Sequence, residues 1–442
     1  YRLGTHGLAV AIVGVALATA SLSRPAAAVQ TSLGPESDVS VAAPIGLDQS
    51  GGLAPGPTLA IAATGDGAVR QTAEAVPRTQ GADQNAATVR FDPRLGLPQW
   101  LRAVRDAPLF SAADNPTPTG VSLPADTSYL KPLGPFSDTR VEVYFPGDVD
   151  HPAAQAWVDT AVVAPSGVPT WIAPPPPGQS VADGPPLPAP PQRISDADAP
   201  GTTAIHIAIV DDASGQMIYG EQPYTEVPQA STTKIATTIV ALERVPDLTQ
   251  RFMVTVSASA MVARDGSSTM GIEPGRSVSL DTLLHGMMLP SGNDAAEQVA
   301  ISLAGSRDQY VDWMNQEAAA LGLRHTHFVN PSGMDAAGHY SSAYDMAMLA
   351  RYAMRNPTFR DLAGTASYTS DGFHMQNLNR LLGVYPGADG VKIGYTDAAH
   401  KTFVASAVHD GHRVYVSLMH SEDLVWDSTA LFNWVWDTFN WQ

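Results

Sequence analysis

The sequence predicts two folded parts, a small all-β module followed by a larger α/β (α+β) domain in which helices cover an antiparallel sheet. Three observations predict this. Short apolar runs separated by turn residues fill positions 96–167, and a proline-rich stretch follows at 168–195. Within 196–442, strand patterns stand at both ends and helix patterns in the middle. Strands from the two ends can pair into one sheet, which the central helices then cover.

Composition limits the class of partner. The chain has 442 residues, too many for one ordinary domain. It carries 43 acidic against 25 basic residues, so its formal net charge is -18. Such a chain repels nucleic acid and gains nothing from anionic membranes, and we therefore expect neither as a partner. Because there is no cysteine, disulfides, thiolate catalysis and cysteine-ligated zinc are excluded.

The N-terminal segment has the layout of an export signal. The apolar run LAVAIVGVALATASL follows Arg2 and precedes the small residues Ala26 to Ala28. Positions 1–28 are therefore predicted to be a signal peptide or an anchor, and the protein is expected outside the cytoplasm. It would be secreted, held in the cell wall, or tethered to the membrane if this segment is retained. Positions 29–95 are rich in Ala, Gly, Ser, Thr and Pro and are predicted to be disordered.

The module at 96–167 is predicted to be an antiparallel β structure. Val141, Val143 and Phe145 alternate with Arg140 and Glu142, as a half-buried strand requires. The spacing of strands and turns resembles a bacterial SH3-like domain. Wall binding and a spacer role both remain open for it. Nine prolines between positions 174 and 191 then predict an extended polyproline linker.

The C-terminal domain has readable element signals. A hairpin is predicted over 203–219 and a helix over 231–243. Leu and Met residues at helical spacing predict a core-facing helix that stops at Pro290. Ser342 and Asp345 have the spacing of a capping box at the start of another helix. Late strands are predicted over 390–396, 402–408 and 413–419, and a final helix from about 428.

Three short motifs carry chemistry. Ser231 and Lys234 stand three residues apart on one face of a predicted helix, where an amine can activate a hydroxyl. Ser291 and Asn293 lie in a polar loop between two apolar helices. Lys392 stands on a late strand, where the word GVKIGYT supplies a positive charge and a glycine that permits close approach of a substrate backbone.

Taken together, Ser-x-x-Lys, Ser-x-Asn and Lys-x-Gly in this order resemble the penicillin-recognising serine enzymes. The words PQASTTKIATTIVALE, LPSGNDAAE, HFVNPSGMD, HYSSAYDMAMLA and DGVKIGYTDAA are similar to those of low-molecular-mass D-alanyl-D-alanine carboxypeptidases. The resemblance covers positions 200–440 and implies the β-lactamase/transpeptidase-like fold. It implies a penicillin-sensitive serine peptidase that acts on peptidoglycan stem peptides and is acylated by β-lactam antibiotics, with no cofactor and no metal.

The resemblance also implies a role for each catalytic side chain. Ser231 would be the nucleophile, Lys234 the general base, and Ser291 the group that passes a proton to the departing D-alanine. A model lysine titrates near ~10.4, so burial or a nearby cation must lower the pKa of Lys234. Lys392 is the candidate cation.

The implied substrate-binding residues lie on the second and third motifs. Asn293 would hold the substrate amide, Lys392 would supply positive charge, and Gly394 would allow close approach. The backbone N–H groups of Ser231 and Tyr395 would form the oxyanion hole. Loss of one such donor typically costs on the order of 3 kcal/mol.

One residue departs from the family pattern. Ile393 stands where the family usually has threonine, whose hydroxyl helps to bind the terminal carboxylate of the substrate. Thr396, Thr402 or Lys401 are candidates to replace that contact. Alternatively, the enzyme prefers cross-linked peptides without a free carboxylate nearby.

Other functions share parts of this pattern. A serine β-lactamase or an endopeptidase shares the fold, but no candidate stands out for the additional glutamate that class A lactamases use. An inactive cell-wall-binding protein would explain Ile393 as decay, although the catalytic groups are all present. The twelve histidines form no H-E-x-x-H motif, and no G-x-S-x-G elbow occurs.

Overall fold

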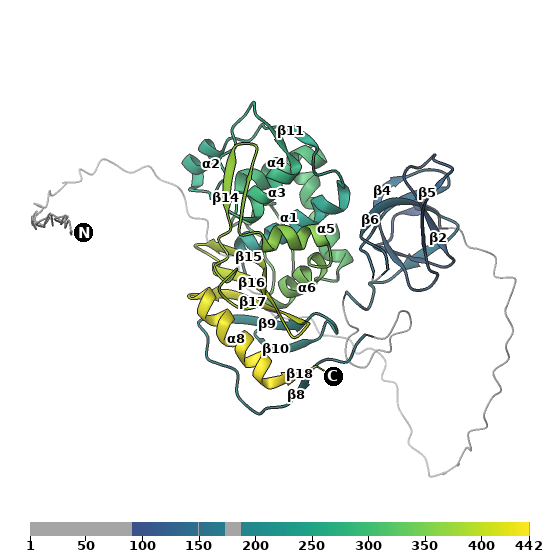
Figure 1. Ribbon diagram of the computed structural model, residues 1–442. Coiled ribbons are helices and arrows are strands. Elements are labelled where there is room, and N and C mark those ends of the chain that lie inside the picture. The colour runs from purple at the N-terminus through teal and green to yellow at the C-terminus, as the bar shows by residue number, and fades with distance from the viewer. Residues whose placement is uncertain (1–90, 149, 173–186, 442) are drawn as a thin grey trace, which may run out of the picture. The chain divides into compact units, whose positions relative to one another are not determined.

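The computed structural model describes residues 91–148, 150–172 and 187–441 (Figure 1). The predicted signal or anchor, most of the predicted disordered segment and the centre of the proline linker lie outside these residues. In the described part of the chain, no helix combines the length and the apolar character needed to cross a bilayer.

The N-terminal module is built from β-strands, as predicted. Asp92 caps a short 3₁₀ turn, η1 (Pro93–Leu95), before the first strand. Seven strands form one antiparallel sheet in the order β3-β2-β6-β5-β4-β1-β7. They are β1 (Trp100–Ala103), β2 (Ala107–Phe110), β3 (Pro118–Leu123), β4 (Tyr129–Phe136), β5 (Arg140–Phe145), β6 (Ala154–Asp159) and β7 (Val163–Ser166). Phe91 packs into the core of this module, which therefore extends to residue 91 at least. Its likeness to an SH3 domain stays a prediction.

The module is packed against the C-terminal domain through buried polar contacts. The indole Nε1 of Trp100 donates to the carbonyl of Ala320 at 2.7 Å. Lys131 on β4 forms ion pairs with Glu243 and Glu317, and all three side chains are buried. These contacts join residues far apart in sequence, so the β module belongs to the same folded body as the C-terminal domain.

The centre of the C-terminal domain is a five-stranded antiparallel sheet in the order β10-β9-β17-β16-β15. Its strands are β9 (His206–Asp211), β10 (Met217–Glu221), β15 (Ala388–Thr396), β16 (His400–His409) and β17 (His412–Ser421). Side chains alternate between two cores, as period-2 strands require. On β16, for example, Phe403 and Ala405 belong to one core and Val404 to the other. The predicted strands are confirmed, and a turn at Asp410-Gly411 joins β16 to β17.

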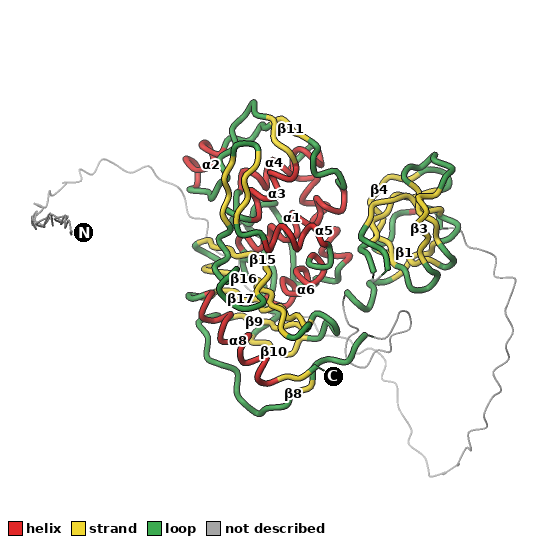
Figure 2. The backbone as a smooth tube through the Cα atoms, in the orientation of Figure 1, coloured by secondary structure: helices red, strands yellow, loops and turns green. Residues whose placement is uncertain are grey.

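Helices cover both faces of this sheet (Figures 1 and 2). One helix, α8 (Leu424–Thr438), packs on β16 and β17, while α6 (Ala343–Ala353) packs on β9 and β17 from the other face. The others are α1 (Lys234–Arg244), α2 (Ala258–Asp265), α3 (Leu280–Met288), α4 (Asn293–Ala304), α5 (Arg307–Ala320) and α7 (Pro357–Gly364). The predicted Leu and Met stripe of α3 is buried in the larger core.

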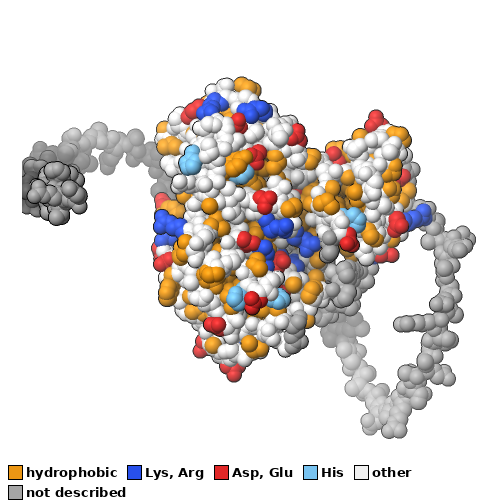
Figure 3. All heavy atoms as spheres, in the orientation of Figure 1, with side chains coloured by type: hydrophobic (Ala, Val, Ile, Leu, Met, Phe, Trp, Pro, Cys, Tyr) orange, Lys and Arg blue, Asp and Glu red, His pale blue; other side chains and the backbone are white. Residues whose placement is uncertain are grey.

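Three two-stranded sheets complete the domain. They pair β11 (Arg251–Met253) with β12 (Ser277–Ser279), β13 (Ser367–Ser370) with β14 (Phe373–Gln376), and β8 (Gln192–Arg193) with β18 (Phe439–Asn440). Both described ends of the predicted linker at 168–195 are packed, since Ile172 is buried in the larger core and β8 pairs with the end of the chain. On the face drawn in Figure 3, acidic and basic side chains are interspersed.

Candidate active site

The candidate nucleophile lies at the junction of a 3₁₀ turn and a helix. Ser231 belongs to η2 (Ala230–Thr233), and α1 begins directly after it at Lys234. The predicted helix thus starts with a tighter turn. Ala230 has a φ of 49°, a left-handed conformation that costs a non-glycine residue energy and is typical of functional sites. Lys234 Nζ lies 2.8 Å from Ser231 Oγ, so the two side chains meet as their spacing predicts.

The ammonium or amine of Lys234 is held by three oxygens. Besides Ser231 Oγ, Nζ donates to Asn293 Oδ1 at 2.7 Å and to the carbonyl of Ser332 at 2.5 Å. The side chain is 0% exposed. Burial first, and then the positive charge of Lys392, lower the pKa of Lys234 well below its ordinary value. A neutral amine here can keep two donated bonds and accept the proton of the Ser231 hydroxyl.

Ser291 and Lys392 form a second pair. Lys392 Nζ on β15 donates to Ser291 Oγ at 3.0 Å and to the carbonyl of Ile393 at 2.9 Å. Burial lowers the pKa of Lys392 to about 7. Ser291 lies in the loop between α3 and α4. Its backbone has a φ of 63°, a left-handed conformation that is strained for a residue other than glycine. A serine beside a partly charged lysine can relay a proton.

The loop that holds Ser291 and Asn293 is fixed by a buried carboxylate. Asp294 accepts hydrogen bonds from the backbone N–H groups of Met270, Gly271 and Ile272, at 2.9, 2.9 and 3.0 Å, as well as from that of Ala295 in its own helix. The backbone N–H of Asn293 also donates to the carbonyl of Ser268 at 2.8 Å. These bonds lock the first turn of α4, and with it the position of the Asn293 amide.

Gly394 lies in close contact with the backbone of Ser231, a contact that the sequence does not reveal. A Cβ atom added there would lie 2.6 Å from the backbone nitrogen of Ser231 and 2.6 Å from Thr402 Oγ1. The glycine therefore lets β15 approach the turn that carries the nucleophile. The predicted close approach of a substrate backbone at Gly394 stays a prediction. Tyr395 follows on the same strand, which is an edge strand of the sheet. Its side chain is 62% exposed, and the predicted role rests on its backbone N–H.

Sequence reasoning missed the loop that faces Lys234 from the other side. Asn330 Oδ1 accepts from the N–H groups of Ser332, Gly333 and Met334 at 3.2, 2.7 and 3.1 Å and so shapes the loop. A Cβ on Gly333 would lie 2.0 Å from the carbonyl oxygen of Ala230. The word HFVNPSGMD was the available signal, but a backbone carbonyl acceptor carries no side-chain signature.

The residues suggested as replacements for the missing threonine are engaged elsewhere. Thr402 is buried and donates to the carbonyl of Gln229 at 3.0 Å. Lys401 donates to the carbonyl of Glu422, and Thr396 donates to Asp335 Oδ1 at 2.8 Å. Ile393 itself is half-buried and packs against the core beneath α8.

In the described part of the chain, no three His, Asp or Glu side chains converge as a metal site would need.

A serine hydroxyl beside a buried lysine, with a second serine–lysine pair and an asparagine around it on this sheet-and-helix frame, defines a serine acyl-enzyme of the penicillin-recognising class. The D-alanyl-D-alanine carboxypeptidase family model, Peptidase S11, matches residues 194–423. The chain belongs to this family and is a serine D-alanyl-D-alanine carboxypeptidase by class, as the motifs predict.

Individual relatives agree with this assignment. The D-alanyl-D-alanine carboxypeptidase DacB2 of Mycobacterium tuberculosis is 38% identical over 249 residues, which are 54% of this chain and 82% of the relative. DacF of Bacillus subtilis is 35% identical over 45% of this chain and 52% of its own length. A crystal structure of a D-alanyl-D-alanine carboxypeptidase from M. tuberculosis aligns with a TM-score of 0.51 at 34% identity, covering 56% of this chain and 96% of that one. The Streptomyces K15 DD-transpeptidase aligns with a TM-score of 0.52 at 29% identity, covering 55% and 100%.

Proposed function

We propose that this chain releases the terminal D-alanine from peptidoglycan stem peptides through an acyl-enzyme on Ser231, and that β-lactam antibiotics acylate the same hydroxyl. The observation that carries the proposal is the 2.8 Å contact between Ser231 Oγ and the buried Nζ of Lys234. A lysine kept neutral by burial is a base at the pH where a serine nucleophile must work.

In the acylation step, Ser231 Oγ attacks the carbonyl carbon of the penultimate D-alanine while its proton passes to Lys234 Nζ. The oxyanion is received by the backbone N–H groups of Ser231 and Tyr395. The peptide C–N bond then breaks, and the leaving nitrogen takes a proton through Ser291 Oγ. D-alanine departs and leaves an ester on Ser231.

In the deacylation step, water attacks the ester carbonyl and gives a proton to Lys234. The tetrahedral intermediate collapses and the C–O bond to Ser231 breaks, Ser231 Oγ recovers the proton from Lys234, and the shortened peptide leaves. Asn293 holds the amide of the acyl group throughout, because its side-chain oxygen is fixed on Lys234, while among the described residues its amide nitrogen has no hydrogen-bond partner and can donate to the substrate. The positive charge on Lys392 binds the terminal carboxylate of the peptide.

The proposed substrate supports a location outside the cytoplasm, where stem peptides of the wall are found, and the predicted N-terminal signal agrees with this location. Membrane attachment follows if that segment is retained. The convergence of the catalytic side chains argues against an inactive wall-binding protein. In such a protein, loss of function would be expected to break one of the contacts among Ser231, Lys234, Ser291 and Lys392. A β-lactamase remains the alternative on the same fold.

The test is release of D-alanine from a pentapeptide that ends in D-Ala-D-Ala, compared among wild type, Ser231→Ala and Ile393→Thr. Wild type should release D-alanine and Ser231→Ala should not. If wild type is silent while a labelled penicillin still acylates it, the substrate assignment is wrong. Rapid turnover of penicillin without D-alanine release would favour the lactamase.

A further inference from the structure

His339 is a buried titratable side chain that none of the catalytic steps above uses. It is 4% exposed and lies in the connection between α5 and α6. Its backbone is held in place nearby, because Ser341 exchanges backbone hydrogen bonds with Val227 at 2.9 and 3.0 Å. Burial of a polar ring costs free energy unless its nitrogens are hydrogen-bonded. Both ring nitrogens of His339 have polar contacts, and these lead to two segments of the active site.

The Nε2 atom of His339 contacts both ends of the turn that carries the nucleophile. It lies 3.0 Å from Thr233 Oγ1 and 3.2 Å from the side-chain amide of Gln229. These two residues come two positions after and two positions before Ser231, and both are 0% exposed. The strained residue Ala230 lies between them. One ring atom therefore touches the turn on either side of the reacting hydroxyl.

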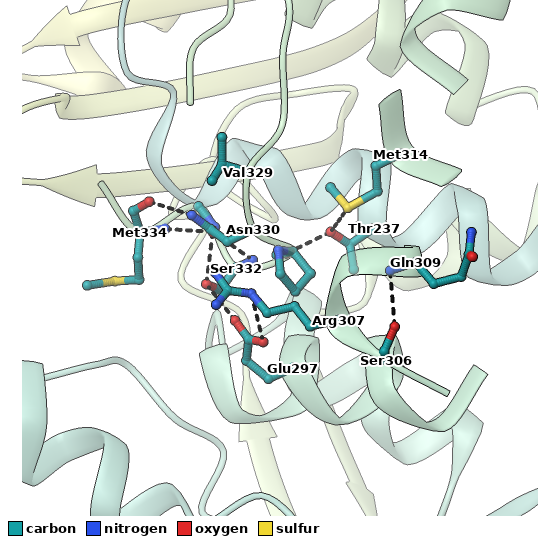
Figure 4. A network of polar contacts seen from close by, with 12 residues as sticks. Thr237, Glu297, Ser306, Arg307, Gln309, Met314, Val329, Asn330, Ser332 and Met334 are labelled. Carbon is teal, nitrogen blue, oxygen red and sulfur yellow. Dashed lines mark hydrogen bonds and ion pairs between the residues drawn. The ribbon is translucent and has the colours of Figure 1, made fainter. Parts of the chain in front are cut away.

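The Nδ1 atom is bound by the loop that faces the general base. The backbone N–H of Val329 donates to it at 2.9 Å. Val329 begins the loop drawn in Figure 4, in which Asn330 points to Ser332. The carbonyl of Ser332 accepts the 2.5 Å hydrogen bond from Lys234 Nζ. The same loop thus orients the ring of His339 and holds the lysine.

These contacts fix the protonation of the ring. Because Nδ1 accepts from Val329, a neutral ring carries its proton on Nε2 and donates it to Thr233 Oγ1. Burial first, and then the charges of three nearby cationic groups, lower the pKa of His339 to about 4. Those groups are His327, Arg307 and Lys234. The ring therefore stays neutral at neutral pH, and both of its hydrogen bonds persist there.

We propose that His339 is a positioning residue for acylation: its neutral ring, oriented by Val329, holds the turn that carries Ser231 and so keeps the nucleophilic hydroxyl within reach of Lys234. The inference rests on the proposed function, because it assumes that Ser231 attacks with Lys234 as its base. A displacement of about 1 Å at the reacting atoms can cost about a hundredfold in rate. A ring that binds both ends of a strained turn opposes such a displacement.

Two amide variants of different reach test the contact with the turn. The amide group of glutamine reaches about as far along the side chain as Nε2 does, whereas that of asparagine ends near the position of Nδ1. His339→Gln can therefore donate to Thr233, and His339→Asn, which carries the same chemical group, cannot. His339→Ala removes both contacts of the ring. His374→Asn, at an exposed histidine on β14, is the control for loss of an imidazole elsewhere.

The quantity measured is the first-order rate constant for acylation by a fluorescent penicillin. Varying the penicillin concentration separates it from the dissociation constant of the reversible complex. A misplaced nucleophile slows the chemical step and leaves reversible binding almost unchanged. We expect His339→Asn and His339→Ala to lower the rate constant by about tenfold to a hundredfold. His339→Gln and His374→Asn should stay within about threefold of wild type, and so should the dissociation constant of every variant.

Thr233→Val probes the same contact from the other side and keeps the shape of the side chain. It should slow acylation as His339→Asn does. Added to His339→Ala, it should slow acylation no further, because the two changes remove the same hydrogen bond. Should His339→Ala fail to fold, the comparison of His339→Gln with His339→Asn and the rate of Thr233→Val still decide.

The outcomes separate this role from the proposed function. Equal rate constants for wild type and His339→Asn, or a His339→Gln variant no faster than His339→Asn, would overturn the positioning role and leave the carboxypeptidase function standing. If wild type neither reacts with penicillin nor releases D-alanine from a D-Ala-D-Ala peptide, the proposed function is wrong and the positioning role falls with it.

Discussion

Replacement of Gly394 by alanine tests how closely strand β15 must approach the nucleophile. The added methyl carbon would lie 2.6 Å from the backbone nitrogen of Ser231, 2.6 Å from Thr402 Oγ1 and 3.0 Å from the Cβ of Ala230. Non-bonded heavy atoms prefer about 3.5–4.0 Å, so the strand and the turn must separate by roughly 1 Å. Overpacking of this kind destabilises a fold by about 1–3 kcal/mol.

The larger effect of Gly394→Ala should be on catalysis. The turn carries Ser231, whose N–H is the proposed oxyanion donor, and loss of one such donor lowers kcat by about 10²–10³. We therefore expect the rate of acylation by a fluorescent penicillin to fall by about two orders of magnitude in protein that is still folded at the assay temperature. Stopped-flow fluorescence measures this rate.

The matched control for that variant is Gly201→Ala. No atom lies within 4 Å of a Cβ at Gly201, so the change adds the same methyl group in open space. Its acylation rate and melting temperature should match wild type. If folded Gly394→Ala acylates within about threefold of wild type, the close approach of β15 to Ser231 does not position the oxyanion donor as we infer.

Three further predictions concern protonation, the buried ion pairs and the third motif. Acylation needs neutral Lys234, whose pKa is lowered by burial and by Lys392, so the acylation rate should rise with pH through that lowered pKa and fall again as Lys392, with a pKa of about 7, loses its charge; a flat pH–rate profile would contradict this. Lys131→Met leaves two facing buried carboxylates without their cation and should lower the free energy of unfolding by about 3–5 kcal/mol, so an unchanged urea midpoint would refute the role of that lysine. Ile393→Thr should lower KM for peptides with a free terminal carboxylate while penicillin acylation stays active, and an unchanged KM would show that the missing hydroxyl is not needed.

Sequence patterns predict the sheet better than the helix ends. The late strands are found where alternation places them because antiparallel strands with a buried face leave a period-2 signal. The last helix begins earlier than predicted, at Leu424, because Asp423 caps it by accepting from the N–H of Trp426. That cap precedes the apolar spacing on which the prediction rested.

The site was predictable where side chains carry the chemistry. Ser231, Lys234, Ser291, Asn293 and Lys392 meet as the three motifs imply. What a sequence cannot show is a contact made by backbone atoms, or one between distant segments that share no recognisable motif.

Two examples make this limit concrete. The carbonyl of Ser332 holds Lys234 through a group that every residue possesses. Lys131 belongs to a module predicted as wall binder or spacer, yet its ion pairs reach Glu243, at the far end of the helix that begins with Lys234. Neither contact leaves a pattern in its own segment.

The central claim is that Ser231 carries the acyl group, and the most direct measurement locates that group. The enzyme is incubated with a penicillin, digested and analysed by mass spectrometry, with Ser231→Ala treated in parallel. We predict a single penicilloyl adduct on the peptide that contains Ser231, and none in the variant. An adduct on another residue, or equal labelling of Ser231→Ala, would contradict the assignment of the nucleophile.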